Sequence, residues 1–223
     1  MSGARKLGIW AGVLGSLGVV LAVVAAVALW TGFHGSTVSS SSMAPTYKRG
    51  QQLMYERVKG TEVRRGDVVL YSAPDRYGFD APVMQRVIGV GGDHIVCCTG
   101  QGQNERLTVN GKPLAEPYVA DGIADGVGAR YDVKVPKGRL FMLGDHRTDS
   151  ADSRFFASDH DGTVPVSAVR GRVTDDYTEP AVLGVAALVG LALALTGIGL
   201  GIAAVAVRKR VVVPPPPPWA VQV

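Results

Sequence analysis

Apolar residues gather in two long runs near the ends of the chain, and shorter apolar stretches alternate with polar turns between them. The first run, residues 7–30, carries no charged side chain, and neither does the second, residues 181–207. About 20 apolar residues are enough to cross the hydrocarbon core of a bilayer as a helix. The pattern therefore predicts two transmembrane helices on either side of a more polar domain.

The charges beside these runs predict the topology. Arg5 and Lys6 precede the first run, and three basic residues, 208–210, directly follow the second. Because basic residues collect on the cytoplasmic side of a span, both runs indicate the same orientation. The resulting layout has a cytoplasmic N-terminus (1–6), a helix (7–30), an extracytoplasmic domain (31–178), a second helix (181–207) and a basic, proline-rich cytoplasmic tail (208–223).

A cleaved secretory signal peptide is the alternative for the first run. Ala26-Val27-Ala28 resembles a cleavage site of the small-residue type. The apolar core of such a signal is usually only 7–15 residues long, which is much shorter than this run. An uncleaved membrane anchor is therefore favoured.

Two features near the second run suggest contacts. Gly197 and Gly201 form a small-xxx-small pair, which would let this helix pack closely against the first. Pro214 to Pro218 favour an extended polyproline segment that acts as a spacer or as a ligand for an aromatic groove.

The segment between the helices reads as β structure. Short apolar stretches with strand character are separated by glycine, asparagine and aspartate, and no stretch shows a sustained helical period. Asn110-Gly111, between two such stretches, is a strong hairpin signal. The expected strands are 68–71, 87–90, 107–109, 112–114, 133–136 and 140–143. The predicted fold class is mainly β, with two transmembrane α-helices.

Charge and cysteine content exclude several functions. The net charge of +4 comes from 23 basic and 19 acidic residues without a long basic run, so a nucleic-acid partner is not expected. The two cysteines, Cys97 and Cys98, are adjacent and bond to each other only with considerable strain. We therefore expect two strand residues rather than a disulfide framework. Two cysteines are also too few for a closed metal site, and neither a metal nor another cofactor is expected.

Two segments are candidates for chemistry. Residues 39–46, Ser-Ser-Ser-Ser-Met-Ala-Pro-Thr, lie just beyond the first helix. Taken alone they would be a flexible linker, although Pro45 stiffens the turn and Met43 offers an apolar side chain to the bilayer surface. Residues 144–154 follow an apolar strand and are crowded with complementary charges. They are either a solvated loop or a buried network that holds a neighbouring element rigid.

Together these segments resemble bacterial signal peptidase I of the Gram-positive or actinobacterial type, over nearly the whole chain. The family's motif Ser-Met-x-Pro-Thr is present at Ser42 to Thr46, and its Arg-Gly-Asp strand at Arg65 to Leu70. The motif Gly-Asp-x-Arg-x-x-Ser-x-Asp-Ser-Arg is complete from Gly144 to Arg154. Arg86 to Asp93 match a fourth motif from its arginine onward.

The resemblance implies a membrane-bound serine peptidase that removes signal peptides from exported preproteins. Ser42 would be the nucleophile, and its N–H together with the Ser40 hydroxyl would form the oxyanion hole. Ser150 would orient the general base. Four charged residues would hold the site together: Asp145, Arg147, Asp152 and Arg154. The preferred substrates would carry small residues before the cut, and membrane lipid would be the other partner.

One position departs from the family pattern. The general base in the family is a lysine directly before the arginine of the fourth motif, and here that position is Gln85. A desolvated lysine accepts the serine proton because burial lowers its pKa, whereas an amide has no usable basicity. Neighbouring strand residues face opposite sides, so Arg86 does not replace it. Lys48 and Lys134 are the other candidate cations for a position near Ser42, and His146 belongs to a motif position that supports rather than catalyses.

Three hypotheses remain from the sequence. The chain is a working signal peptidase with an unusual base, or a catalytically impaired relative that binds signal peptides or assists an active paralogue. The third is a membrane protein with a β ectodomain and no role in peptide processing, which the motifs argue against.

Overall fold

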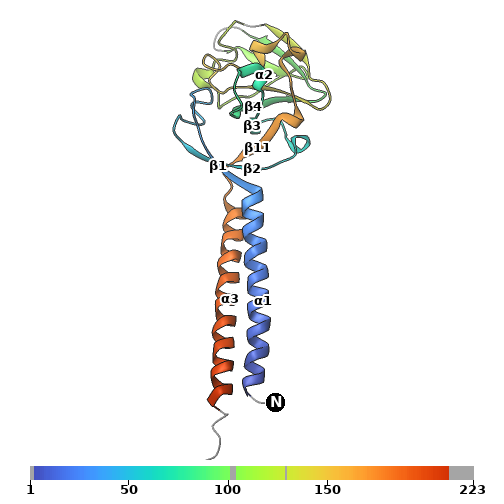
Figure 1. The fold of residues 1–223 in the computed structure, drawn as a ribbon. Coiled ribbons are helices and arrows are strands. Elements are labelled where there is room, and N and C mark those ends of the chain that lie inside the picture. Colours follow the sequence, from blue (N-terminus) through green and yellow to red (C-terminus); the bar gives the residue numbers. More distant parts are fainter. Residues whose placement is uncertain (1–2, 101–103, 129, 211–223) are drawn as a thin grey trace, which may run out of the picture. The chain divides into compact units, whose positions relative to one another are not determined.

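The protein is described by a computed structural model that covers residues 3–100, 104–128 and 130–210. It divides into two compact units (Figure 1). One unit holds the terminal segments, 1–31 and 176–223, and the other holds residues 32–175. The predicted proline segment, 214–218, lies outside the described residues.

The terminal unit consists of two long helices, α1 (Gly3–Gly32) and α3 (Thr178–Arg210). Each contains one of the predicted apolar runs, and each is long and apolar enough to cross a membrane. Glu179 lies in the first turn of α3, where a negative charge stabilises the positive end of the helix dipole.

Helices α1 and α3 approach so closely that glycine is required at the contact. A Cβ atom added to Gly190 would lie 2.5 Å from the backbone nitrogen of Ala22, and one added to Gly197 would lie 2.6 Å from the Cα atom of Gly15. Small residues permit this approach of two backbones within a membrane. The predicted close packing through Gly197 is confirmed, and a Cβ added to Gly201 would make an ordinary contact of 3.8 Å with Ala11.

The strands of the second unit form two antiparallel sheets in the described part of the chain. The seven-stranded sheet has the order β1-β2-β11-β3-β4-β9-β10, and the four-stranded sheet has the order β7-β6-β5-β8. The larger sheet contains β1 (Phe33–Thr37), β2 (Gln52–Glu56), β3 (Val68–Tyr71), β4 (Val83–Val90), β9 (Arg139–Leu143), β10 (Val164–Pro165) and β11 (Val169–Thr174). The smaller contains β5 (His94–Thr99), β6 (Arg106–Val109), β7 (Lys112–Pro113) and β8 (Tyr131–Lys134).

Short helical turns join these strands. The four-residue helix α2 (Pro74–Tyr77) connects β3 to β4 and begins with a proline, which is well tolerated in a first turn. Within the described ranges, the 3-10 turns are Gly60–Glu62, Ala120–Gly122, Ser153–Phe156, His160–Gly162 and Val166–Ala168.

The mainly β fold class is confirmed, and the predicted strands correspond to β3, the end of β4, β6 to β9 and the hairpin between β6 and β7. Asn110 and Gly111 both have positive φ angles, 54° and 76°, as this tight hairpin turn requires. Four strands were not predicted: β1, β2 and β11, which form one side of the larger sheet, and β10 at its opposite edge. The core lies on both faces of β4 and β9: Val87 and Met142 pack in one cluster, and Ile88 and Phe141 pack in another.

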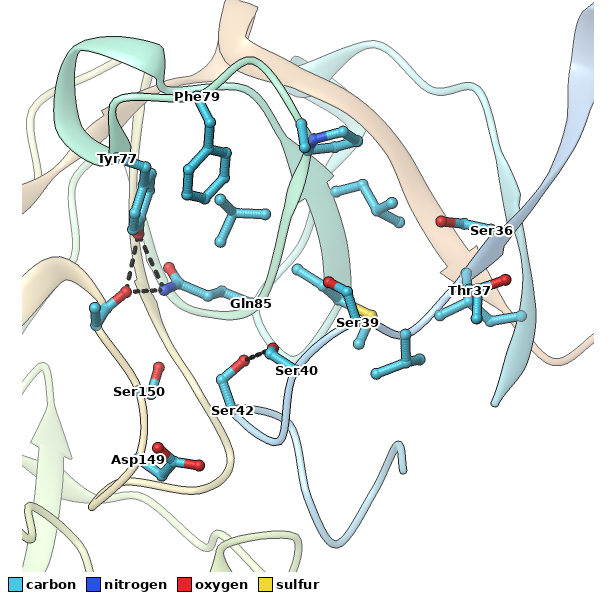
Figure 2. Close-up of a pocket in the computed structure, with 18 of the residues that line it drawn as sticks. Ser36, Thr37, Ser39, Ser40, Ser42, Tyr77, Phe79, Gln85, Asp149 and Ser150 are labelled. Atoms are coloured by element: carbon cyan, nitrogen blue, oxygen red, sulfur yellow. Dashed lines mark hydrogen bonds between the residues drawn. The ribbon is translucent and has the colours of Figure 1, made fainter. Parts of the chain in front are cut away.

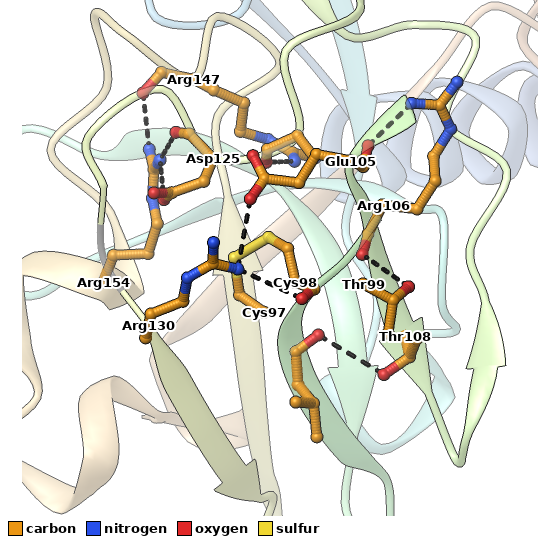
Figure 3. Close-up of a disulfide and its surroundings, with 12 residues drawn as sticks. Cys97, Cys98, Thr99, Glu105, Arg106, Thr108, Asp125, Arg130, Arg147 and Arg154 are labelled. Atoms are coloured by element: carbon orange, nitrogen blue, oxygen red, sulfur yellow. Dashed lines mark hydrogen bonds and ion pairs between the residues drawn. A yellow bond between two sulfur atoms is a disulfide. The ribbon is translucent and has the colours of Figure 1, made fainter. Parts of the chain in front are cut away.

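The cysteine prediction was right in part. Cys97 and Cys98 are residues of β5, as expected, but they are bonded to each other (Figure 3). The pairing of β5 with β6 shifts register between Val96 and Thr99, so the two cysteines lie where the regular ladder is interrupted. The expectation that they stay unbonded assumed a regular strand and was wrong.

The helix contact gives a first prediction. In a chain with Ala11 and Gly201 changed to cysteine and Cys97 and Cys98 changed to serine, oxidation in lipid should join α1 to α3, because the Cβ separation suits a disulfide. Adding Gly190→Val should reduce the cross-linked fraction several-fold by separating the helices. The control is Gly199→Val on the same helix, where an added Cβ meets nothing within 4 Å. Equal cross-linking in both variants would contradict the close contact.

Candidate active site

A buried methionine fixes the segment that carries Ser42. Met43 is fully buried in a cluster with Val38, Leu53 and other apolar residues. The backbone turns here, with Ala44 N donating to Ser41 O and Tyr47 N donating to Met43 O. The suggestion that Met43 faces the bilayer was therefore wrong: its side chain anchors the turn inside the β unit.

Ser42 and Ser40 present their hydroxyl groups to each other at a cavity. Their Oγ atoms are 2.9 Å apart, and both residues line a cavity of about 520 Å³ (Figure 2). Its walls are largely apolar and come from the segment after β1 and from β2, β3 and β4; they include Val38, Leu53, Leu70, Val83 and Met84. The cavity thus offers a hydroxyl pair beside an apolar surface.

Gln85 lies in the same cavity but is bonded elsewhere. It is 1 % exposed, on β4 opposite Val69 of β3. Its Oε1 accepts from the Tyr71 hydroxyl at 2.7 Å. Its Nε2 donates to the backbone oxygen of Ala151 at 2.9 Å and to the Tyr77 hydroxyl at 3.3 Å. Both polar atoms of the amide are therefore used in a network that does not include Ser42.

The two tyrosines of this network do not supply a base. Their hydroxyl groups lie 2.8 Å apart. Burial raises the pKa of Tyr71 well above its usual value and also raises the pKa of Tyr77. Both are therefore neutral hydroxyls at physiological pH, and they act as hydrogen-bonding partners of the amide.

Ser150 contributes a hydroxyl with no partner. It lies in the loop after β9, is 5 % exposed, and its Oγ makes no hydrogen bond with any described residue. Figure 2 shows it below the Gln85 amide and to the left of Ser42. Gly144 permits this placement, because a Cβ there would overlap Ser150 and would lie 2.6 Å from the backbone oxygen of Ser42. A buried polar atom without a partner marks a position suited to a further polar group.

An ion pair joins the strand of Gln85 to the loop after β9. Arg86 donates from Nε and Nη2 to the two oxygens of Asp145, at 2.8 and 2.6 Å. Asp145 is fully buried and also accepts from the Thr46 hydroxyl at 2.5 Å. Arg86 thus points away from the cavity, as the strand alternation predicted. Through Asp145, three segments that are distant in sequence are held together: β4, the loop after β9 and the turn that contains Thr46.

The comparisons with known proteins identify the family of the chain. The profile of the family described as "Signal peptidase, peptidase S26" matches residues 12–177. The chain belongs to the signal peptidase family. The resemblance drawn from the motifs is therefore confirmed, and the family is one of serine endopeptidases.

Individual relatives carry the name signal peptidase I. The chain is 34 % identical to one from Bacillus licheniformis over 146 residues, which covers 61 % of this chain and 74 % of the relative. It is 32 % identical to one from Bacillus caldolyticus, covering 71 % of this chain and 86 % of the relative. A Mycobacterium tuberculosis relative is 40 % identical over 121 residues, which is 48 % of this chain and 40 % of that protein. A solved signal peptidase I from Enterococcus faecalis is 26 % identical and covers 51 % of this chain and 97 % of its own, with a TM-score of 0.39.

The other base candidates of this signal peptidase lie away from Ser42. Lys48 is exposed after the turn that carries Ser42 and does not line the cavity, and Lys134 is exposed on β8 of the smaller sheet. The backbone N–H of His146 donates to Ser42 O at 3.0 Å, while its ring lies 3.8 Å from Asp149. Within the described residues, Ser40 is the hydrogen-bond partner of the Ser42 hydroxyl.

The other charged residues expected to support the signal peptidase site, Arg147, Asp152 and Arg154, lie together in a buried network. Arg147 donates to Glu116, to the backbone oxygen of Ala124 and to that of Gly144. Arg154 pairs with Asp152 at 2.7 Å and contacts Asp125. Asp152 also accepts from Gly144 N at 3.1 Å. The sequence analysis found neither Glu116 nor Asp125, because they lie in an irregular segment without a motif.

The buried pair Arg147–Glu116 gives a second prediction. Both side chains are almost fully buried, at 1 % and 4 % exposed, so Arg147→Met leaves an unpaired carboxylate inside the domain. We expect a loss of about 3–5 kcal/mol in the free energy of unfolding. Pulse proteolysis of the full chain across a urea series measures it.

Arg130→Met is the control for this loss. Arg130 is 65 % exposed and pairs with Glu105 at 3.2 Å, so its removal should cost about 1 kcal/mol or less. An equal loss in both variants would contradict the assignment of Arg147 as a buried structural cation.

Proposed function

We propose that the chain cleaves signal peptides from exported preproteins, with Ser42 as the nucleophile. The observation that carries the proposal is the pair of hydroxyls of Ser42 and Ser40, 2.9 Å apart at the edge of a largely apolar cavity. Ser42 Oγ attacks the scissile carbonyl, and the Ser40 hydroxyl with the Ser42 N–H stabilises the oxyanion that forms.

The cavity walls account for the kind of substrate. Val38, Leu53, Leu70 and Met84 lie beside the serine pair and present aliphatic surface. A peptide with small side chains before the cut can bring its backbone close to Ser42 along this surface. Signal peptides with small residues at these positions fit it.

The base position supports a second candidate function. Gln85 uses both polar atoms of its amide on Tyr71, Tyr77 and Ala151, and it has no basicity to offer Ser42. General-base help is typically worth about 10²–10⁴-fold in rate. A chain without a general base binds signal peptides and cleaves them slowly, or the chain serves as a non-catalytic relative of an active peptidase.

Cleavage of a labelled preprotein by the full chain in lipid distinguishes the two candidate functions, an active peptidase and a slow or non-catalytic relative. We expect slow cleavage by the parent protein, none by Ser42→Ala, and a rate about 10²-fold or more higher for Gln85→Lys. The new amine would lie among the groups that now bind the amide and near the unpartnered Ser150 hydroxyl, where burial lowers its pKa toward neutrality.

Gln52→Lys is the matched control, because it adds the same charge at an exposed position of β2 that does not line the cavity. An inert parent with an active Gln85→Lys variant selects the second candidate. If Gln85→Lys is inert although correctly folded, the Ser42–Gln85 arrangement is not a peptidase site.

We also propose the membrane layout of the chain. Two helices that could cross a membrane flank the β unit, and the basic residues beside them favour cytoplasmic termini with residues 31–178 outside. A cysteine at exposed Lys137 should react with an impermeant maleimide in intact cells, and one at Arg5 only after lysis. The reverse labelling would contradict this orientation.

A further inference from the structure

The active-site cavity carries a single negative charge. Among its lining residues in the described ranges, Asp149 is the only aspartate, glutamate, lysine, arginine or histidine, because the base position is Gln85. Its side chain is 57 % exposed. No described lysine or arginine pairs with it, and the nearest titratable partner is the His146 ring, with Nδ1 3.8 Å from Asp149 Oδ2. The cavity therefore presents an uncompensated carboxylate.

Ser41 holds this carboxylate in place. The Ser41 hydroxyl donates to Asp149 Oδ2, which ties the carboxylate to the residue next to the nucleophile. No described residue donates to the other oxygen, Oδ1. An oriented carboxylate with one free oxygen suits an ammonium or guanidinium group from a bound ligand.

Asp149 lies beyond Ser42 along the cavity. Figure 2 shows Ser42 and Ser40 between Ser36 and Thr37 on one side and Ser150 and Asp149 on the other. The first side belongs to β1 and faces the apolar walls from β2 to β4 that suit the residues before the cut. The part of the substrate after the cut then leaves past Asp149. An extended chain advances about 3.3 Å per residue, so its first two residues pass through this region.

We propose that Asp149 determines specificity on the leaving side of the cut, by favouring substrates with lysine or arginine in the first two residues after the scissile bond. This inference rests on the proposed function and deepens it. The same carboxylate attracts the new amino terminus of the product, which becomes an ammonium group once the peptide bond is broken. Acidic residues at these positions are disfavoured by like-charge repulsion.

Peptide binding tests the inference without requiring turnover. The full chain with Ser42→Ala, in zwitterionic lipid, is titrated with three signal-peptide substrates that differ only in the two residues after the cut: Lys-Lys, Gln-Gln or Glu-Glu. We expect the Kd to be about three- to fivefold lower for Lys-Lys than for Gln-Gln and higher for Glu-Glu, as for a partly exposed ion pair. The difference should shrink as salt rises.

Two variants isolate the carboxylate. Asp149→Asn keeps an acceptor for Ser41 and should make the three peptides bind alike, and Asp149→Lys should invert their order. The matched control, Asp132→Asn, removes an exposed carboxylate on β8, outside the cavity, and should leave the order unchanged.

Equal Kd values for the three peptides, or an order that survives Asp149→Asn, overturns the inference. If the proposed function is wrong, the binding measurements give a different result. A peptide with bulky residues before the cut would then bind as well as the signal peptide, whatever follows the cut. If no peptide binds, the cavity is not a signal-peptide site, and the inference falls with it.

Discussion

The buried ion pair between Arg86 and Asp145 is the interaction on which the site depends. Arg86 belongs to β4, Asp145 follows β9, and Thr46 of the turn that begins at Ser42 donates to the same carboxylate. Because Asp145 is fully buried, losing Arg86 leaves its charge without compensation. One carboxylate thus holds three segments at fixed separations, and the positions of Ser42, Gln85 and Ser150 follow from it.

Much of this arrangement could be predicted from sequence, for physical reasons that differ between elements. The strands around Val68–Tyr71 and Leu140–Leu143 are fully apolar because both faces are buried, and this makes them easy to recognise. Strand β1, Phe-His-Gly-Ser-Thr, has no apolar alternation, and its place in the sheet depends on pairing with β2. Such a strand is set by tertiary contacts that local patterns do not encode.

The same distinction applies to the site. The motif residues were predicted because they lie in short contiguous stretches. Tyr71 and Tyr77 were not, because their role depends on reaching Gln85 from neighbouring elements. Their network shows that glutamine is well accommodated: a buried amide needs a donor for its oxygen and acceptors for its nitrogen, and Tyr71, Tyr77 and the Ala151 oxygen provide them. The surroundings thus satisfy the hydrogen bonds of glutamine at the family's lysine position. The Ser150 hydroxyl, in contrast, has no hydrogen-bond partner among the described residues.

The bond between Cys97 and Cys98 has a consequence for the environment in which the chain is proposed to work. These are the two cysteines of the sequence, and each is occupied by the other. Thiol–disulfide exchange proceeds by the attack of a free thiolate on a disulfide sulfur. Because both sulfur atoms of this chain are bonded to each other, the chain has no free thiolate with which to attack a disulfide in a client, and it leaves the disulfides of exported polypeptides unchanged.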